Sequence, residues 1–326
     1  MTVAEAGYYL DSFLAPLAPV LGRQDVTDIW INRPGELWIE ILGGGIERIS
    51  EPALDEALLE RLARQIAAHS SQGICRAQPL LAATLPDGSR VQVAAPPATR
   101  DGYAFAIRRH VSSDLALSDW EDAGAFDAAS AHTAANMRDD HQFRSLAADE
   151  AAPFLRKAIR DRKNILIAGG TSTGKTTFLN SLIAEIPSEE RLVLIEDTAE
   201  LRLTHQNAVG LIAARGELSE AQITAEDLLI AALRMRPDRI MLGELRGTEA
   251  FTFLRAVNTG HPGSMTTIHA DTPQRAIEQL ALLVLQAGSR LGRDDVRHYV
   301  RTSVDVFVQL ERRAGKRRVS QVLVTE

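Results

Sequence analysis

Residues 169–176 match the pattern G-x-x-x-x-G-K-[ST], which is typical of loops that bind nucleotide phosphates. The glycines allow the backbone to wrap closely around phosphates, with its amide N–H groups pointing inward. Lys175 would bring a positive charge to the β- and γ-phosphates, and the hydroxyl of Thr176 would ligate Mg²⁺. We therefore expect a site for ATP and Mg²⁺. The residues expected to bind the nucleotide are Gly169, Gly170, Thr171, Ser172, Thr173, Gly174, Lys175, Thr176 and Thr177.

A second chemical signal is a carboxylate at the end of an apolar strand. Residues 240–242 are apolar, and Gly243 and Glu244 follow them. In many nucleoside triphosphatases an acid in this position, commonly Asp, lies beside Mg²⁺ and the attacking water. We expect Glu244 to be catalytic and to ligate the metal. The alternative is that Glu244 is a strand-end residue paired with Arg246, which could also orient the carboxylate or lie at an interface.

Two more polar strand ends follow the same logic. Leu194 and Ile195 precede Glu196 and Asp197, whose carboxylates could hold Mg²⁺ through water or orient the nucleophile. Asp197 could instead cap the next segment. His269 ends the polar stretch 263–269 and could sense a γ-phosphate by hydrogen bonding. A single His is more often structural, but a position at the end of a parallel strand favours a functional role.

The C-terminal half has the pattern of a parallel sheet covered by helices on both faces, because apolar strands alternate with helices. A strand precedes the phosphate-binding loop and a helix over 175–183 follows it, so the helix N-terminus adds its dipole to the site. Thr224 and Thr272 are expected to cap helices, the second of which ends at Gly288. The expected strands are 165–168, 192–195, 240–242 and 265–268. Two further strands, 304–310 and 319–324, flank a basic turn at 312–318, expected to be a solvated turn or a contact for an acidic partner or membrane.

The N-terminal half reads as an α+β domain built on an antiparallel sheet. Helices are expected over 3–21 and 52–69, where apolar residues recur at helical spacing. Short alternating stretches between turns predict strands, and Gly43, Gly44 and Gly45 form one such turn. Residues 111–150 are rich in Asp, Ala and Ser, and we expect a connector with short helical pieces. The predicted domains are 1–110, a linker over 111–150, and 151–326.

In their order and spacing, the four chemical elements resemble the Walker A, Asp box, Walker B and His box of the secretion traffic ATPase superfamily. They correspond to residues 169–176, 196–200, 240–244 and 263–269. Members of this superfamily power type II and type IV secretion, type IV pili and conjugation. The short chain, the run 233–238 and the sequence Thr259-Gly260-His261 favour the small ATPase of type IV secretion and conjugation systems. A pilus-retraction or type II secretion ATPase is the alternative.

This resemblance implies a fold and an assembly. It implies an α/β fold with a RecA-like P-loop domain at the C-terminus, a homo-hexamer, and inner-membrane components of the secretion apparatus as partners. It also implies that arginines of the N-terminal domain reach the nucleotide. Arg90 and Arg108 are the candidates, and Arg100 and Arg109 stay open as alternatives. A guanidinium group suits a phosphoryl group because it offers several fixed donors.

Composition narrows the functional classes. The chain has 326 residues and a net charge of −7, and the acidic balance argues against a nucleic-acid motor, which is one rival function. The other rival, a scaffold that binds ATP without turnover, conflicts with the presence of both Glu196 and Glu244. The single cysteine excludes an internal disulfide and a four-cysteine zinc site. Without an apolar run of membrane-spanning length or a basic signal segment, we expect a cytosolic protein, with peripheral association with the inner membrane left open.

Overall fold

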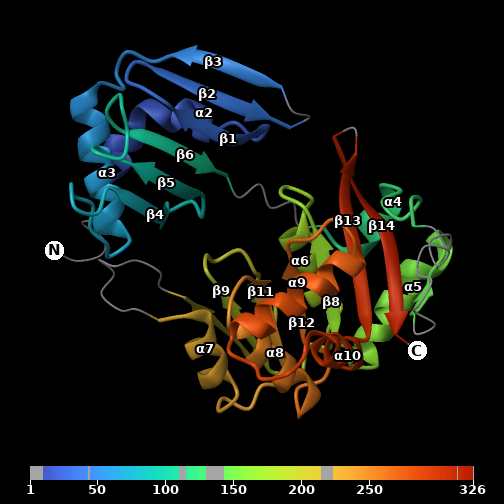
Figure 1. Cartoon of the computed structure of the whole chain (residues 1–326). Helices are drawn as coiled ribbons and strands as arrows, with labels where there is room; N and C mark the ends of the chain where they lie inside the picture. Colours follow the sequence, from blue (N-terminus) through green and yellow to red (C-terminus); the bar gives the residue numbers. More distant parts are fainter. Residues whose placement is uncertain are drawn as a thin grey trace. The chain divides into compact units, whose positions relative to one another are not determined.

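The computed structural model describes residues 10–42, 45–109, 115–129, 143–213, 223–313 and 315–325. The chain divides into two units (Figure 1). Unit 1 contains the described residues of Met1–Val111 and of Ala214–Ile223, and unit 2 contains those of Ser112–Ala213 and Thr224–Glu326. The domain boundaries expected at 110 and 150 remain a prediction. The expected turn at 43–44, the start of the first helix at 3–9, and parts of the expected linker at 111–114 and 130–142 lie outside the described residues.

Unit 1 is an antiparallel sheet with helix α3 against one face, which confirms the expected α+β class. Its strands alternate between buried and exposed positions. In β6, Phe105 and Ile107 are buried, whereas Ala106 and Arg108 face outward. The strands are β1 (Val26–Ile31), β2 (Glu36–Ile41), β3 (Ile46–Ser50), β4 (Leu80–Thr84), β5 (Arg90–Ala94) and β6 (Ala104–Arg108), in the order β3-β2-β1-β6-β5-β4.

The helices of unit 1 close its core. Helix α3 (Glu56–His69) begins later than the predicted 52–69, because the side chain of Asp55 accepts a hydrogen bond of 2.7 Å from the backbone N–H of Leu58 and so caps the helix. Leu62 and Ile66 on its inner face are fully buried. Near the N-terminus, residues 10–14 are helical and lead into η1 (Ala15–Leu17) and α2 (Ala18–Leu21).

Unit 2 is an α/β unit built on a mixed sheet. The strands from β10 to β13 in the sheet order are parallel, as expected, but the predicted C-terminal hairpin belongs to the same sheet. Val306 of the hairpin pairs with Ile165 in parallel register, and the returning strand is antiparallel. The strands are β7 (Phe143–Ser145), β8 (Ile165–Gly169), β9 (Leu192–Glu196), β10 (Ala208–Ile212), β11 (Arg239–Leu245), β12 (Met265–Ile268), β13 (Val306–Arg313) and β14 (Lys316–Thr325), in the order β10-β9-β11-β12-β8-β13-β14-β7.

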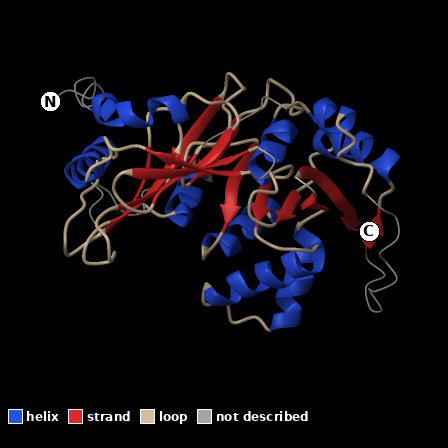
Figure 2. Cartoon of the chain, turned by 90° about the horizontal axis from the view of Figure 1, so that it is seen from above, coloured by secondary structure: helices blue, strands red, loops and turns tan. Residues whose placement is uncertain are grey.

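Helices cover both faces of this sheet (Figure 2). One core contains side chains of α4, α5 and α6, and the opposite core contains side chains of α7, α8, α9 and α10. Thr224 and Thr272 cap α7 and α9 as predicted. Among the described helices, none is long and apolar enough to cross a membrane. The helices are α4 (Leu117–Asp122), α5 (Ala148–Arg160), α6 (Lys175–Ile183), α7 (Ala225–Ala232), α8 (Glu249–Asn258), α9 (Pro273–Gln286) and α10 (Arg293–Ser303).

Helix α4 comes from the stretch that we expected to be a linker, and it packs in the core of unit 2. Leu117, Trp120 and Phe126 are buried there. The ring of Trp120 meets the ring of Phe178 edge-on, with 5.0 Å between centroids. Since Phe178 lies on α6, which begins at the phosphate-binding loop, α4 supports the helix that carries Lys175.

Candidate nucleotide-binding site

The phosphate-binding loop has the backbone that its glycines predict. It connects β8 to α6, and Gly174 precedes the helix with φ +91°, a conformation that L side chains rarely adopt. A Cβ added to Gly169 would lie 2.5 Å from Oγ1 of Thr173, so no larger residue fits without movement. Thr173 in turn donates a hydrogen bond of 2.9 Å to the carbonyl of Gly170 and holds the loop closed.

Lys175 is folded back onto this loop. Its Nζ atom donates hydrogen bonds of 2.9 Å and 3.2 Å to the carbonyl oxygens of Gly169 and Gly170. Burial lowers the pKa of Lys175, while the negative charge of Glu244 acts in the opposite direction. The Nζ atom lies 3.9 Å from Oε1 of Glu244. The structure therefore brings the lysine of the phosphate-binding loop and the carboxylate of β11 together.

Glu244 is held by Arg246. The Nε atom of Arg246 donates a hydrogen bond of 2.8 Å to Oε2 of Glu244, and its Nη2 contacts the same oxygen. Nη1 of Arg246 donates to Oδ2 of Asp197 at 3.2 Å. Burial alone would lower the pKa of Arg246, but the carboxylates of Glu244, Asp197 and Glu200 raise it above its ordinary value. One guanidinium thus links Glu244, on β11, to Asp197, which directly follows the neighbouring strand β9.

Glu196 faces a different set of partners. It is only 7% exposed, and its Oε2 accepts hydrogen bonds of 2.8 Å from the backbone N–H groups of both Glu200 and Leu201. Asn180 on α6 fixes the same loop, because its side chain bonds the backbone of Glu200 and of Arg202. The loop that carries Asp197 is therefore tied to the helix that carries Lys175.

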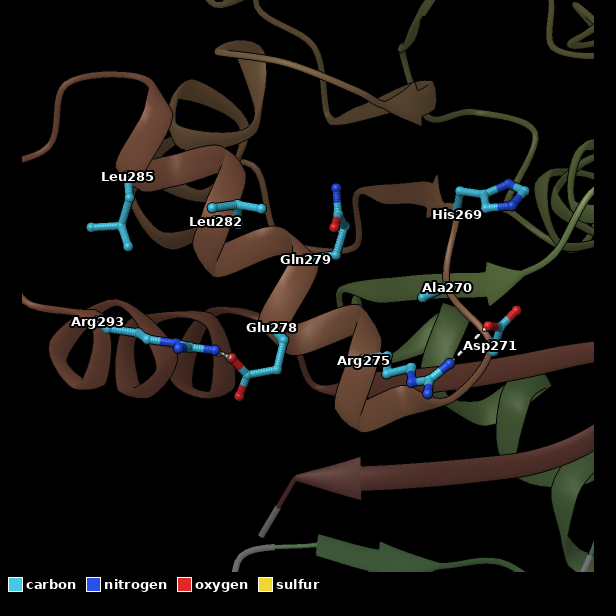
Figure 3. A pocket seen from close by; sticks show the side chains of 9 residues that line it. All are labelled: His269, Ala270, Asp271, Arg275, Glu278, Gln279, Leu282, Leu285 and Arg293. Carbon is cyan, nitrogen blue, oxygen red and sulfur yellow. Dashed lines mark hydrogen bonds and ion pairs between the residues drawn. The ribbon is translucent and has the colours of Figure 1, made fainter.

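His269 follows β12, which lies between β11 and β8. Thr267 ties this strand to β11 by donating a hydrogen bond of 2.7 Å to the carbonyl of Gly243. His269 itself is exposed and lines an open cavity of about 520 Å³ on the flank of α9. Figure 3 shows the ion pair between Arg275 and Asp271 beside it. The lining residues are His269, Ala270, Asp271, Arg275, Glu278, Gln279, Leu282, Leu285 and Arg293.

The two candidate arginines lie in unit 1 and face each other. Arg90 on β5 is the cross-strand partner of Arg108 on β6. Arg108 donates a hydrogen bond of 3.1 Å to Oδ1 of Asp28. The ion pair with Asp28 offsets the like charge of Arg90 opposite Arg108. Arg109 instead donates hydrogen bonds to the backbone carbonyls of Arg23 and Val26, which gives it a structural role within the unit.

The oxygen donors around the loop suit Mg²⁺. Among the described residues, no group of three or more His, Cys, Asp or Glu side chains could hold a metal ion by itself. Mg²⁺ is commonly bound by one or two protein oxygens together with substrate phosphates. The hydroxyl of Thr176 at the start of α6 and the carboxylate of Glu244 beside Lys175 form such a set of hard donors.

Sequence reasoning missed one residue at this site. We assigned Arg317 to a basic turn, and the structure places it against the phosphate-binding loop. A Cβ added to Gly174 would lie 2.8 Å from Cδ and 3.2 Å from Nε of Arg317. Its position follows from the pairing of β13 with β8, which brings the hairpin next to the loop, and the basic turn carries no sequence signal of that pairing.

Comparison with known proteins gives consistent relatives. Residues 12–321 match the model of a family described as type II/IV secretion system protein. The type IV secretion system protein VirB11 of Bartonella henselae is 38% identical over 324 residues, which cover 95% of this chain and 91% of that protein. The type IV secretion system protein PtlH of Bordetella pertussis is 40% identical over 312 residues, which cover 94% of this chain and 91% of the relative.

A solved structure shares the fold. The crystal structure of the pilus retraction motor PilT with bound ADP is 20% identical, with a TM-score of 0.60. The match covers 96% of this chain and 82% of that one. At this identity the likeness concerns the fold alone, and it agrees with the α/β architecture expected from the sequence.

Proposed function

The chain belongs to the type II/IV secretion system protein family, in the branch of VirB11 and PtlH, and we propose that it hydrolyses ATP as the motor of a type IV secretion system. The identities of 38% and 40% to type IV secretion proteins favour this system over type II secretion and over pilus retraction. They span both units of the chain, so the proposal concerns the whole protein.

One observation carries the proposal. The Nζ atom of Lys175 lies 3.9 Å from Oε1 of Glu244, with the N-terminus of α6 beside them. A P-loop can bind a nucleotide without cleaving it. Hydrolysis also needs a group that activates water, so the presence of the Glu244 carboxylate favours a motor over a scaffold that binds ATP without turnover. Glu244 is held in place by Arg246 and lies next to the lysine that would bind the β- and γ-phosphates.

The chemistry assigned to these residues is phosphoryl transfer to water. The water oxygen forms a bond to the γ-phosphorus, the bond from that phosphorus to the oxygen it shares with the β-phosphate breaks, and ADP leaves. Glu244 orients the water and accepts its proton. Lys175 leaves the carbonyls of Gly169 and Gly170 to bind the phosphates. Glu196 fixes the loop of Asp197, and His269 is assigned a hydrogen bond to the γ-phosphate.

Mg²⁺, when bound, would offset the negative charge of the phosphates. Thr176 and Glu244 would hold it, with Asp197 contributing through water. Asp197 shares Arg246 with Glu244, so its carboxylate lies in the same cluster of charges. The oxygen chemistry of these residues is what supports this assignment.

Arg90 and Arg108 are proposed to stabilise the charge that develops on the transferred group. Their cross-strand arrangement places two guanidinium groups on one outward face of unit 1, where both could donate to the same anion. We propose that the working form is a homo-hexamer in contact with inner-membrane components of the secretion apparatus. In that ring the arginines could serve their own site or the site of a neighbouring subunit.

The test is phosphate release by the purified full-length chain with ATP and Mg²⁺. Lys175→Ala should abolish release and weaken ATP binding, because the β- and γ-phosphates lose their counter-ion. Lys157→Ala is the matched control, since Lys157 is an exposed lysine on α5 paired only with Asp161 among the described residues. Normal phosphate release by Lys175→Ala would sink the proposal.

A further inference from the structure

The hairpin of β13 and β14 lies beside the phosphate-binding loop. Leu310 on β13 pairs with Gly169, the first residue of the loop, and the strand continues for three residues beyond that point. The hairpin therefore extends past the end of β8 (Figure 1). The returning strand places Arg317 opposite Arg312, one pair before the last pair of the hairpin, Arg313 and Lys316.

Arg317 packs directly on the loop. Its Cδ and Nε would lie 2.8 Å and 3.2 Å from a Cβ at Gly174, and Cη2 of Trp120 would lie 3.4 Å from the same point. The side chain is half-buried. Gly174 immediately precedes Lys175, so this guanidinium approaches the residue at which the helix dipole begins. Both Arg317 and Trp120 therefore lie against Gly174.

The charge of Arg317 is not compensated. Among the residues that the structure describes, Arg317 forms no hydrogen bond and no ion pair. Its cross-strand neighbour Arg312 is a second cation, whereas Arg318 lies opposite Glu311. Burial and the nearby Arg312 lower the pKa of Arg317. Partial burial of a charge without a partner is unfavourable, and an anion bound at the loop would relieve this cost.

The sheet order indicates which part of the nucleotide lies there. Lys175 and Glu244 meet on the side of β8 that faces β12 and β11, whereas Arg317 comes from the opposite side, where β13 and β14 lie. The γ-phosphate belongs with Glu244, because the attacking water must reach it. The α-phosphate and the nucleoside would then lie on the opposite side of the loop, where β13 and β14 are.

We propose that Arg317 binds a phosphate oxygen of the nucleotide on the α-phosphate side of the loop, remote from the site of cleavage. This inference rests on the proposed function, because it requires that the loop binds a nucleotide. A contact of this kind is made equally in the ground state and the transition state. Its loss should therefore raise KM and leave kcat unchanged.

The experiment measures Kd for ATP and for ADP by calorimetry, and KM and kcat by phosphate release, on the full-length chain. Arg317→Gln should raise both Kd values and the KM by about ten- to hundredfold and by similar factors, since hydrogen bonds to charged groups contribute in that range. Arg317→Lys should recover part of the affinity. Arg313→Gln is the matched control, because Arg313 is an exposed arginine of the same hairpin with Lys316 opposite.

Arg317→Lys keeps the positive charge and Arg317→Gln removes it. The ratio of their Kd values for ADP therefore reports the contribution of the charge at position 317, even if both variants unfold at a lower temperature than the wild type. Equal ADP affinities of the two variants overturn the inference, as does a loss confined to ATP, which would place Arg317 at the γ-phosphate. If the wild type binds and the Arg317 variants bind equally well, only this inference fails. If the wild type binds neither ATP nor ADP, the proposed function is wrong, and so is the inference that Arg317 binds the nucleotide.

Discussion

The Nε atom of Arg246 lies 2.8 Å from Oε2 of Glu244. The backbone N–H groups of Arg246 and Gly247 both donate to the buried carboxylate of Glu249, at 2.7 Å and 2.8 Å. The main chain that carries Arg246 is therefore fixed, and the side chain reaches Glu244 from a defined position. From the sequence, Glu244 was either a catalytic residue or a strand-end residue paired with Arg246. The two roles are compatible, because the hydrogen bonds from Arg246 hold the carboxylate of Glu244 in one orientation.

Arg246→Ala should lower kcat by about ten- to hundredfold with little change in KM, because a hydrogen-bonded charge that positions Glu244 is removed. Arg246→Lys should restore only part of kcat, since an ammonium group keeps the charge but loses the planar pair of donors. Arg255→Ala, an exposed arginine on α8, is the control. Steady-state kinetics on the full chain decide, and an unchanged kcat in Arg246→Ala contradicts the positioning role.

Glu196 should behave as an anchor of its loop. Glu196→Ala leaves two backbone N–H groups at Glu200 and Leu201 without their acceptor, so both the melting temperature and the turnover should fall. Glu196→Gln keeps one acceptor oxygen and should retain most of the melting temperature, with a smaller loss of turnover. Thermal unfolding and phosphate release are measured on the same preparations. A Gln variant as inactive as the Ala variant, at wild-type stability, points instead to a role for the charge itself.

The sequence was sufficient for features that depend on local signals. The phosphate-binding loop, the strand and helix on either side of it, and the caps at Thr224 and Thr272 follow from residues close together in the chain. Glu244 and the phosphate-binding loop could be expected at the same edge of the sheet, because the carboxyl ends of parallel strands meet there.

Features that depend on distant pairing could not be predicted. The position of Arg317 is set by the pairing of β13 with β8, two strands separated by more than a hundred residues, and no pattern near Arg317 reports it. Trp120 was missed for another reason. Its neighbours are mainly Asp, Ala and Ser, so the average composition of the stretch concealed the buried side chains of Leu117, Trp120 and Phe126.

Arg90 and Arg108 provide the test of how the two units cooperate. Arg108→Ala should lower kcat by about a thousandfold or more and change KM far less, if its guanidinium stabilises the transferred phosphoryl group. Arg64→Ala, an exposed arginine on α3 paired with Glu60, should have no effect. A wild-type kcat in both Arg90→Ala and Arg108→Ala would show that neither arginine stabilises the transferred phosphoryl group.

Mixing inactive Arg108→Ala with inactive Lys175→Ala then separates two geometries. Recovered activity shows that a subunit receives its arginine from a neighbour. Absence of recovery, with exchange of subunits confirmed by labelled chains, shows that the arginine acts within its own chain. Recovered activity would also support the assembly of subunits that the proposed homo-hexamer requires.

Glu36 makes the stability of unit 1 depend on pH. The hydrogen bond from Arg33 is the largest cause that lowers its pKa, burial acts in the opposite direction, and bonds from Arg48 and Trp38 add to the effect, so that the pKa is about 2 instead of 4.5. A carboxylate with a lowered pKa stabilises the fold above its unfolded pKa, and this stabilisation is lost as pH falls toward 2.

The expected result is a melting temperature that is higher for the wild type than for Glu36→Gln at about pH 7, with a difference that shrinks by about pH 3. Glu60→Gln, which removes a carboxylate from an exposed ion pair, should show little difference at either pH. A difference in melting temperature that grows as the pH falls would contradict the assignment of an ionised Glu36 held by Arg33 and Arg48.

The central claim is that Glu244 serves the cleavage of ATP rather than its binding. The most direct measurement is ATP affinity and phosphate release on one preparation of Glu244→Gln, with the wild type alongside. Gln keeps the size and the hydrogen-bonding capacity of Glu244 but cannot accept the proton or carry the charge. We expect a Kd for ATP close to that of the wild type and a turnover lower by about 10²–10⁴-fold. Turnover within about twofold of the wild type would contradict it and pass this role to another group.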